Sequence, residues 1–597
     1  MDIPVRKKDL VFLAAALILT VIFTSPWLFR DFVGIEHDTY FHLSRIDALS
    51  EALFHGDFIP RIYPYENNGF GYASPMFYSD FFLVIPAVFY HFGMPLSSSY
   101  VLMMFLTVFA GTFTMMHACE KICGDSLTSI LCGSAYCFAN YHITDIYVRS
   151  AVGEAMALVF LPVQLEGLYL LFECRDQSGW KPLFIGMTGL LLTHNLTFLL
   201  ACILTGAFFL IYFSKLPKEI FFAFLRAGVL SFLCTVFFSL PMAEQLLSQK
   251  FYLHWYAGGS DLAGYALPLW KYFVNTTVFG YGSNDLDRNL QMTVNVGIFL
   301  SLMPLLWIFA KEKKHALFVN LCLIFGYICM ILPWDAFPWD HMAALRILQF
   351  PWRLFTLALP LLAIVSAAGL SSLLKQRKPV LLVLLLLVCG EGIFHVLPAF
   401  ERTYGITSKM NYSFLINGGL TNPYYSATYV RIQLAGGEYL PQSSPDFREL
   451  EPMIWTSDGS PAGIGYDKNR TRISFTASSL PEDGILELPL TYYLGYTVRG
   501  KNGEAAELFP SRDALIRVHL TAPGTYAVRY SGTPLQHVTA VISLLAWVIT
   551  ALLFIKGEDV FSAFSEKTSK NERQKSDGSI LSKSSFSLKI PFSKPKS

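Results

Sequence analysis

Long apolar runs separated by short polar segments fill the first 400 residues of the chain, and a different pattern follows them. A helix needs about 20 apolar residues to cross a bilayer, and about twelve runs approach that length. They lie at residues 10–29, 99–118, 127–141, 155–172, 182–194, 196–213, 220–242, 294–310, 316–332, 347–370, 379–396 and 537–554. The pattern predicts a polytopic α-helical membrane protein with external loops at about 30–98 and 243–293.

Residues 399–535 change to the alternation of apolar and polar positions that is typical of β-strands. The clearest segments are 471–476, 485–490 and 515–520, and glycine, proline, asparagine and aspartate turn signals separate them. We expect an extracytoplasmic β-sandwich after a membrane domain at 1–398, and a final transmembrane helix at 536–556. The tail at 557–597 is rich in serine and lysine, which predicts a disordered cytoplasmic extension.

The composition agrees with a membrane protein and narrows the classes of partner. Of 597 residues, 53% are hydrophobic and only 15% are charged, so the lipid bilayer is the expected surrounding. The formal net charge of +1 argues against nucleic acid, which calls for a basic surplus. All ten cysteines precede residue 390 and lie in or beside apolar runs, so a disulfide framework is not expected.

The distribution of lysine and arginine predicts how the protein is oriented across the membrane. Cytoplasmic loops collect these residues, and the twelve-span count puts the start of the chain, five loops and the tail on one basic side. Both termini are then cytoplasmic in a multi-pass protein of the plasma membrane. The apolar stretch 76–92 is the alternative thirteenth span, but Pro75, Asp80, Pro86 and His91 favour a helix that lies on the membrane surface.

The first external loop carries the first candidate site. In a helix, Asp38, His42 and Arg45 would share one face at spacings of four and three residues. Asp38 there could act as a general base toward an acceptor hydroxyl, while His42 or Arg45 orients it or meets phosphate charge. The alternative is a solvated juxtamembrane helix with an ordinary acid–base pair, which the spacing alone favours.

Further polar residues lie at the predicted external ends of spans. Arg149 and Glu154 would extend the site or form an interfacial salt bridge. His194 either faces a cavity or lies in a simple turn between two spans. Arg346 and Arg353 could bind a lipid phosphate through forked hydrogen bonds, or anchor the helix end beside the headgroups.

Several motifs resemble known membrane glycosyltransferases. Asp38-Thr-Tyr-Phe-His is similar to the Asp-Pro-Tyr-Phe-Asn stretch in the first external loop of oligosaccharyltransferase catalytic subunits, which belong to the GT-C class. Across most of its length the chain resembles bacterial membrane proteins labelled 6-pyruvoyl-tetrahydropterin-synthase-related, and the YfhO-like proteins. The matching segments are 36–46, 71–78, 149–154, 349–353, 437–441 and 488–496.

The resemblance implies a GT-C-like fold and a glycosyltransferase that moves a sugar from a polyprenyl-phosphate carrier to an extracytoplasmic cell-envelope glycan or polymer. Glu154 corresponds to an acidic residue that helps oligosaccharyltransferases bind a divalent metal, so Asp38 and Glu154 would hold Mg²⁺ or Mn²⁺ if a metal is needed. The acidic and amide residues that precede this glutamate in that family have no counterpart here, which leaves the metal open.

Two other classes of function compete with the enzyme. In a lipid or polysaccharide transporter or flippase, Asp38, Glu154 and Glu391 would line a pathway. Transporters often show two matching halves, and the sequence has no such symmetry. In a non-catalytic envelope scaffold, the β domain would bind polymer.

Overall fold

The computed structural model describes residues 7–28, 33–34, 36–254, 261–274, 276–280, 292–311, 313–409, 437–447 and 450–556, and the predicted tail at 557–597 lies outside them. Within these residues, seven helical stretches are long and apolar enough to cross a membrane. They are Leu96–Cys123, Val152–Glu173, Asn195–Lys215, Lys218–Ser248, Pro351–Leu374, Lys378–Phe400 and Pro534–Ile555. The prediction of a multi-pass helical membrane protein is confirmed at this level.

The other five predicted spans correspond to helices that are shorter or more charged. They are α1 (Lys7–Thr24), α6 (Ser126–Cys137), α9 (Trp180–Leu191), α14 with η7 (Ile298–Leu302 and Met303–Phe309), and α15 (Ala316–Ile331). A 12-residue helix such as α6 or α9 extends about 18 Å, which is less than the ~30 Å of hydrocarbon in a bilayer. The count of twelve therefore stays a prediction.

The ends of three helices converge on the side predicted to be cytoplasmic. Lys8 of α1 forms a 2.8 Å ion pair with Glu120, near the end of α5 (Leu96–Cys123). Lys375, which follows α16 (Phe355–Leu374), donates a hydrogen bond to the backbone oxygen of Gly124. Loops assigned to one side by their charge thus lie together, which supports the order of the spans.

The first loop folds against the opposite end of the bundle. It contains α2 (Thr39–Phe54), α3 (Ser74–Phe77), η1 (Phe81–Leu83) and α4 (Val84–His91). The apolar stretch 76–92 is thus broken into short pieces, and its longest helical part, Phe81–His91, extends only about 16 Å. It is too short for a thirteenth span.

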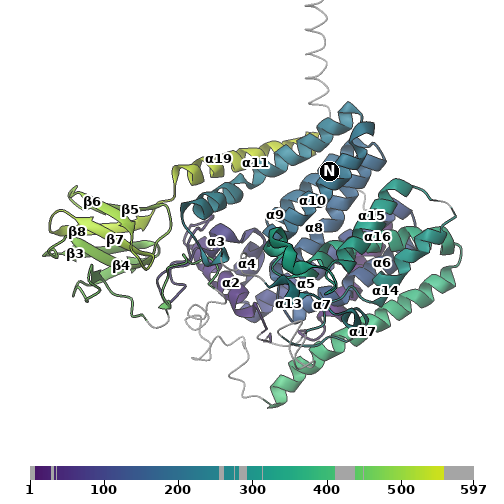
Figure 1. Ribbon diagram of the computed structural model, residues 1–597, viewed down its shortest axis with the longest axis horizontal. Helices are drawn as coiled ribbons and strands as arrows, with labels where there is room; N and C mark the ends of the chain where they lie inside the picture. Colours follow the sequence, from purple (N-terminus) through teal and green to yellow (C-terminus); the bar gives the residue numbers. More distant parts are fainter. Residues whose placement is uncertain are drawn as a thin grey trace, which may run out of the picture.

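Two four-stranded antiparallel sheets form the β domain, which lies beyond one end of the bundle (Figure 1). One sheet has the order β1-β4-β7-β6 and the other β2-β3-β8-β5. The strands are β1 (Trp455–Thr456), β2 (Tyr466–Asn469), β3 (Arg472–Ala477), β4 (Ile485–Thr491), β5 (Tyr496–Gly500), β6 (Ala506–Pro510), β7 (Leu515–Leu520) and β8 (Gly524–Tyr530). Inward residues such as Phe475, Leu488 and Val518 share one core, as in a sandwich.

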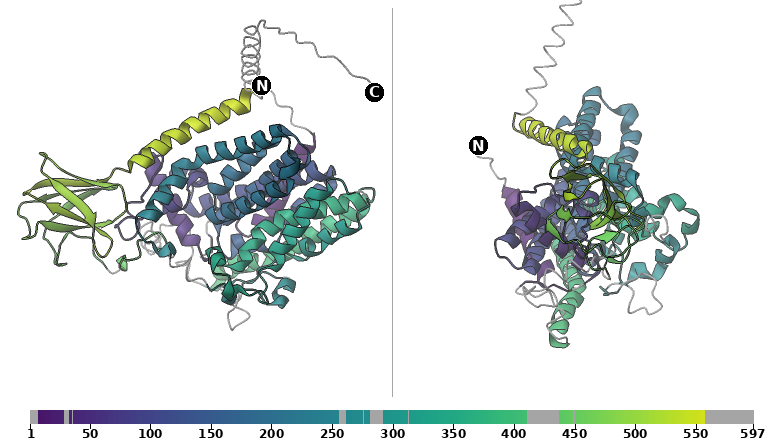
Figure 2. Two further views of the ribbon diagram at one scale, coloured as in Figure 1. Left: turned by 45° about the horizontal axis from the view of Figure 1, so that its top comes forward. Right: turned by 90° about the vertical axis from the view of Figure 1, so that its left-hand side faces the viewer.

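The β domain is held from two directions. It follows α17 (Lys378–Lys409) and precedes α19 (Pro534–Lys556), which runs beside α11 (Lys218–Ser248) in both views (Figures 1 and 2). Trp547 of α19 donates to the backbone oxygen of Cys234 over 3.1 Å. On the other flank, Lys468 of β2 donates to the backbone oxygens of Pro64, over 2.8 Å, and Gly69. The first loop and the β domain are therefore packed together.

Candidate functional site

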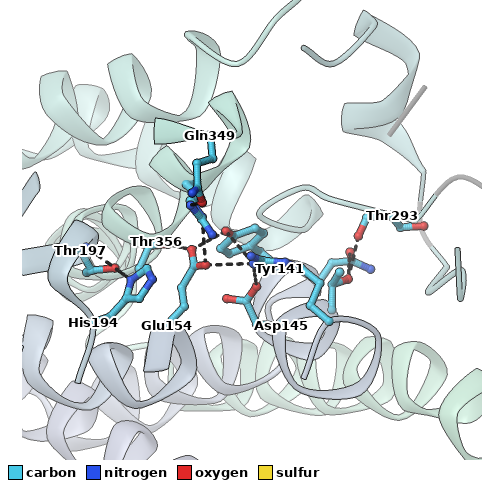
Figure 3. Close-up of polar contacts among 12 residues, drawn as sticks. Tyr141, Asp145, Glu154, His194, Thr197, Thr293, Gln349 and Thr356 are labelled. Atoms are coloured by element: carbon cyan, nitrogen blue, oxygen red, sulfur yellow. Dashed lines mark hydrogen bonds and ion pairs between the residues drawn. The ribbon is translucent and has the colours of Figure 1, made fainter. Parts of the chain in front are cut away.

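Glu154 is the centre of a buried polar cluster. It lies in the first turn of α8 (Val152–Leu168), where the helix N-terminus favours a carboxylate, and is 1% exposed. Tyr141 of α7 (Asn140–Tyr147) and Thr356 of α16 each donate a 2.6 Å hydrogen bond to its Oε1. Arg149 donates to its Oε2 over 3.0 Å (Figure 3). Both oxygens of this carboxylate are occupied.

Arg149 joins Glu154 to a second carboxylate. Its guanidinium also forms an ion pair with Asp145, one helical turn earlier, and lies 4.6 Å from the centre of the Trp352 ring. Asp145 is fully buried, and burial together with the charge of Glu154 raises its pKa. Breaking such a buried network by removing one partner is costly, so these charges hold the ends of α7 and α8 together.

Arg353 points its side chain at the same cluster from the 3₁₀ helix η10 (Pro351–Leu354). One terminal nitrogen donates to the backbone oxygen of Leu348 over 3.1 Å and to Oε1 of Gln349 over 2.5 Å, while Nε lies 3.6 Å from Glu154. The other terminal nitrogen has no hydrogen bond to the residues described. Gln349 adopts φ +63°, ψ −41°, a strained backbone of the kind that clusters at functional sites.

Asp38 lies beside these arginines at the start of α2. Its backbone N–H donates to the backbone oxygen of Arg149 over 3.1 Å, and the hydroxyls of Thr39 and Ser150 are 2.9 Å apart. Its half-buried carboxylate receives no hydrogen bond from the described part of the chain. Burial raises the pKa of Asp38, while the charges of Arg149 and Arg353 partly oppose that rise.

Arg45 and His42, both on the buried side of α2, form a second layer of polar contacts. Arg45 is buried, pairs with Asp80 through two nitrogens, and donates to the backbone oxygens of Tyr78 (3.2 Å) and Ser79 (2.9 Å). Its third nitrogen lies 3.2 Å from Nδ1 of His42. Burial lowers the pKa of His42. Most guanidinium donors are therefore committed within the protein, and this contact set favours a positioning role for both residues.

Because Gly153 has no side chain, the polar contacts around Glu154 and those around Arg45 can lie close together. A Cβ atom at this position would lie 1.8 Å from the Tyr78 hydroxyl and 2.6 Å from the backbone oxygen of Thr193. His194 follows directly and caps α10 (Asn195–Tyr212), with Nδ1 2.8 Å from the Thr197 hydroxyl. Its ring centre is 6.2 Å from that of Tyr78. His194 therefore borders both layers.

Arg346 and Glu438 lie further from the centre of the cluster. Arg346 is exposed on the 3₁₀ helix η9 (Ala343–Leu348), and its proposed contact with a lipid phosphate stays a prediction. Glu438 was not a candidate, yet the segment before the β domain turns back over the site, where Leu253 donates to the backbone oxygen of Glu438 over 2.8 Å. Burial, with a contribution from the charge of Asp38, raises the pKa of Glu438 to about 7.

The donor set around Glu154 does not fit a divalent cation. Both carboxylate oxygens already accept hydrogen bonds, and Arg149 and Arg353 bring two positive charges within 3.6 Å. Hard cations need several free oxygen ligands, and no group of three or more His, Cys, Asp or Glu residues suited to a metal occurs among the residues that the structure describes. Asp38 supplies one carboxylate that accepts no hydrogen bond from the described residues, which is too few ligands for such a cation.

Comparison with known proteins gives distant likenesses. No family model matches the chain, so the family resemblance of the motifs stays a prediction. An uncharacterized protein of Lactococcus lactis subsp. cremoris (strain MG1363) is 25% identical over 201 residues, which are 32% of this chain and 32% of that protein. The chain thus matches about a third of the length of this curated relative.

Two solved structures are similar to the chain, both at TM-scores below 0.5. The arabinofuranosyltransferase AftD from Mycobacteria has a TM-score of 0.37 at 15% identity, with 67% of this chain and 27% of that chain covered. ArnT from Cupriavidus metallidurans, bound to undecaprenyl phosphate, has a TM-score of 0.38 at 13% identity, with 71% and 69% covered.

Proposed function

We propose that this chain is a membrane glycosyltransferase that moves a sugar from a polyprenyl-phosphate carrier to an extracytoplasmic cell-envelope acceptor. One observation carries the proposal: the carboxylate of Asp38 has no hydrogen-bond partner in the described residues, yet the charges of Arg149 and Arg353 act on it. An acid held in this way is suited to take a proton from a hydroxyl. The donor class follows from the motif resemblance of the first loop.

In the proposed reaction, the acceptor hydroxyl attacks the anomeric carbon of the donor sugar as its proton passes to the Asp38 carboxylate. The bond between that carbon and the carrier phosphate breaks, and the phosphate leaves with the electron pair. Arg353, whose second terminal nitrogen has no hydrogen bond among the described residues, meets the negative charge that develops on the phosphate. The proton on Asp38 is then lost to water, which restores the base.

The remaining candidates support these two groups. Glu154 holds Arg149 and Arg353 and is a positioning residue, because its oxygens are already used. His42 and Arg45 position α2, and with it Asp38, by their contacts with Tyr78 and Asp80. For His194 we propose contact with substrate through Nε2, since Nδ1 is engaged by Thr197. Arg346 would contact substrate at the rim.

The test is Asp38→Asn in a strain that lacks the gene, with envelope glycans profiled by mass spectrometry. We expect the variant to lose the same glycan signal as the deletion, while Asp340→Asn restores it. Asp340 is an exposed aspartate in η8 (Trp339–His341) and serves as the matched control. Full restoration by Asp38→Asn at normal protein level would contradict the assigned base. Vesicles that contain the protein and move labelled carrier lipid without sugar transfer would favour a flippase instead.

A further inference from the structure

One outer face of the β domain carries a basic groove, remote from the site around Glu154. The groove lies on the sheet β2-β3-β8-β5 and encloses about 440 Å³. Its cations are Arg472 of β3, Arg499 of β5, Lys501 directly after β5, and Arg529 of β8. Hydroxyl groups lie between them, from Ser474, Thr497 and Thr525.

The strand register arranges these cations in rows. Arg472 lies opposite Arg529, and Arg529 also lies opposite Thr497, so two arginines are neighbours across the sheet. Arg499 is opposite Ala527, one row further, and Lys501 donates its backbone N–H to Thr525 in the next row. Since residues in a strand rise about 3.4 Å each, the rows extend over roughly 14 Å.

The four positive charges have no counter-ion in the described residues. None of them forms an ion pair, and the Arg472 side chain donates only to the Ser474 hydroxyl, over 3.2 Å. Asp467 lies opposite Ser474 on β2, and Glu504 lies beside Gly500, but neither is paired with these cations. Like charges directly opposite each other destabilise a sheet, so folding alone does not explain the row of Arg472 and Arg529.

We propose that this groove binds a linear anionic polymer of the cell surface, with a phosphodiester in each repeat. Arginine forks match phosphate geometry, and a ladder of cations suits a chain of anions better than one small ion does. The hydroxyls would hydrogen-bond the sugar or polyol between phosphates. This binding is independent of the proposed transfer reaction, because no residue of the groove contacts the site.

The direction of the groove favours a polymer over the membrane surface. Arg529 lies five residues before Pro534, where α19 begins, and Tyr496 faces Tyr530 at this end of the sheet. Passing from Arg529 to Arg499 to Lys501 therefore leads away from the helix that enters the membrane. A bilayer would meet the first row alone, whereas an extended polymer reaches all of them.

The experiment uses the full chain in nanodiscs of neutral phosphatidylcholine and titrates it with polyglycerol phosphate of about ten repeats. The groove variant combines Arg499→Gln, Lys501→Gln and Arg529→Gln, all exposed positions, and the control is Arg512→Gln, an exposed arginine between β6 and β7. We expect the groove variant to lose affinity by about tenfold or more and to lower the slope of log K against log salt by about 2, while the control does neither.

Two outcomes would overturn the proposal. Equal affinity of the groove variant and the wild-type chain would assign polymer binding to another surface. Cosedimentation of the wild-type chain with phosphatidylglycerol vesicles but no binding of polyglycerol phosphate, both lost in the groove variant, would make the groove a membrane contact. Preserved thermal unfolding of the groove variant shows that its loss of affinity comes from the removed charges.

Discussion

The backbone N–H of Asp38 donates to the backbone carbonyl oxygen of Arg149 over 3.1 Å. This hydrogen bond joins the loop after the first helix to the turn between α7 and α8, two segments more than 100 residues apart. The neighbouring pair of Thr39 and Ser150 reinforces it. The proposed base and the arginine cluster are thereby kept in one arrangement.

The pH dependence of transfer follows from the raised pKa of Asp38. A general base must be ionised, so kcat/KM falls as the pH drops through a pKa that lies above the ordinary 3.8. Arg353→Gln removes a charge that lowers this pKa, so the acidic limb of the profile moves to higher pH. Arg512→Gln, far from the site, leaves the limb in place. An acidic limb that does not move in Arg353→Gln would mean that another group titrates.

Replacing Glu154 by Gln lowers stability, because Arg353 then loses its buried anion and Arg149 keeps only Asp145. We expect the free energy of unfolding to fall by about 3–5 kcal/mol, seen as earlier thermal unfolding in detergent. Glu391→Gln is the matched control, a membrane-helix glutamate without an ion pair among the described residues. Similar melting of Glu154→Gln and the wild-type chain would contradict a structural network at this position.

Gly153→Ala disturbs the contact between the two layers of the site. The added methyl group would meet the Tyr78 hydroxyl at 1.8 Å, so α8 or Tyr78 must shift, and overpacking of this kind costs about 1–3 kcal/mol. Gly206→Ala in α10 is the control, since a Cβ there has open space. Melting temperatures of both variants, with transfer activity, test the difference, and equal behaviour would refute the close approach.

Lys468→Met loosens the docking of the β domain on the first loop. The Lys468 ammonium donates to two backbone oxygens of that loop, and hydrogen bonds to charged groups contribute about 1.5–3 kcal/mol. We expect faster amide hydrogen exchange over residues 61–72 than in the wild-type chain. Lys501→Met, an exposed lysine of the same domain, should leave that exchange unchanged when no polymer is present.

The sequence predicted the fold where a repeating pattern carries the information. Long apolar runs gave the seven long helices, and the alternation at 471–476, 485–490 and 515–520 falls within one residue of β3, β4 and β7. Short helices such as α6 and α9 were harder, because the hydrophobic run continues past the helix end. Periodicity cannot locate such ends.

The site was less accessible to sequence reasoning, because packing between distant helices decides its partners. Asp145 was missed, although its spacing of four residues from Arg149 is a detectable signal. Tyr141 and Thr356 have no such signal, since ordinary hydroxyl residues reach Glu154 only in the folded bundle. The pairing of Arg45 with Asp80 likewise depends on tertiary structure.

The segment at 437–442 hydrogen-bonds to residues 250–253 from a point late in the chain, and the order of synthesis therefore delays these contacts. Leu253 and Tyr252 can form their hydrogen bonds with Glu438 and Leu440 only after nearly three quarters of the chain has been made. At a synthesis rate of about 5–20 residues per second, these hydrogen bonds stay unmade for many seconds after Tyr252 and Leu253 have been synthesised. A nascent chain would therefore carry its first helices in the membrane without this contact, which forms only when the β domain is about to be made.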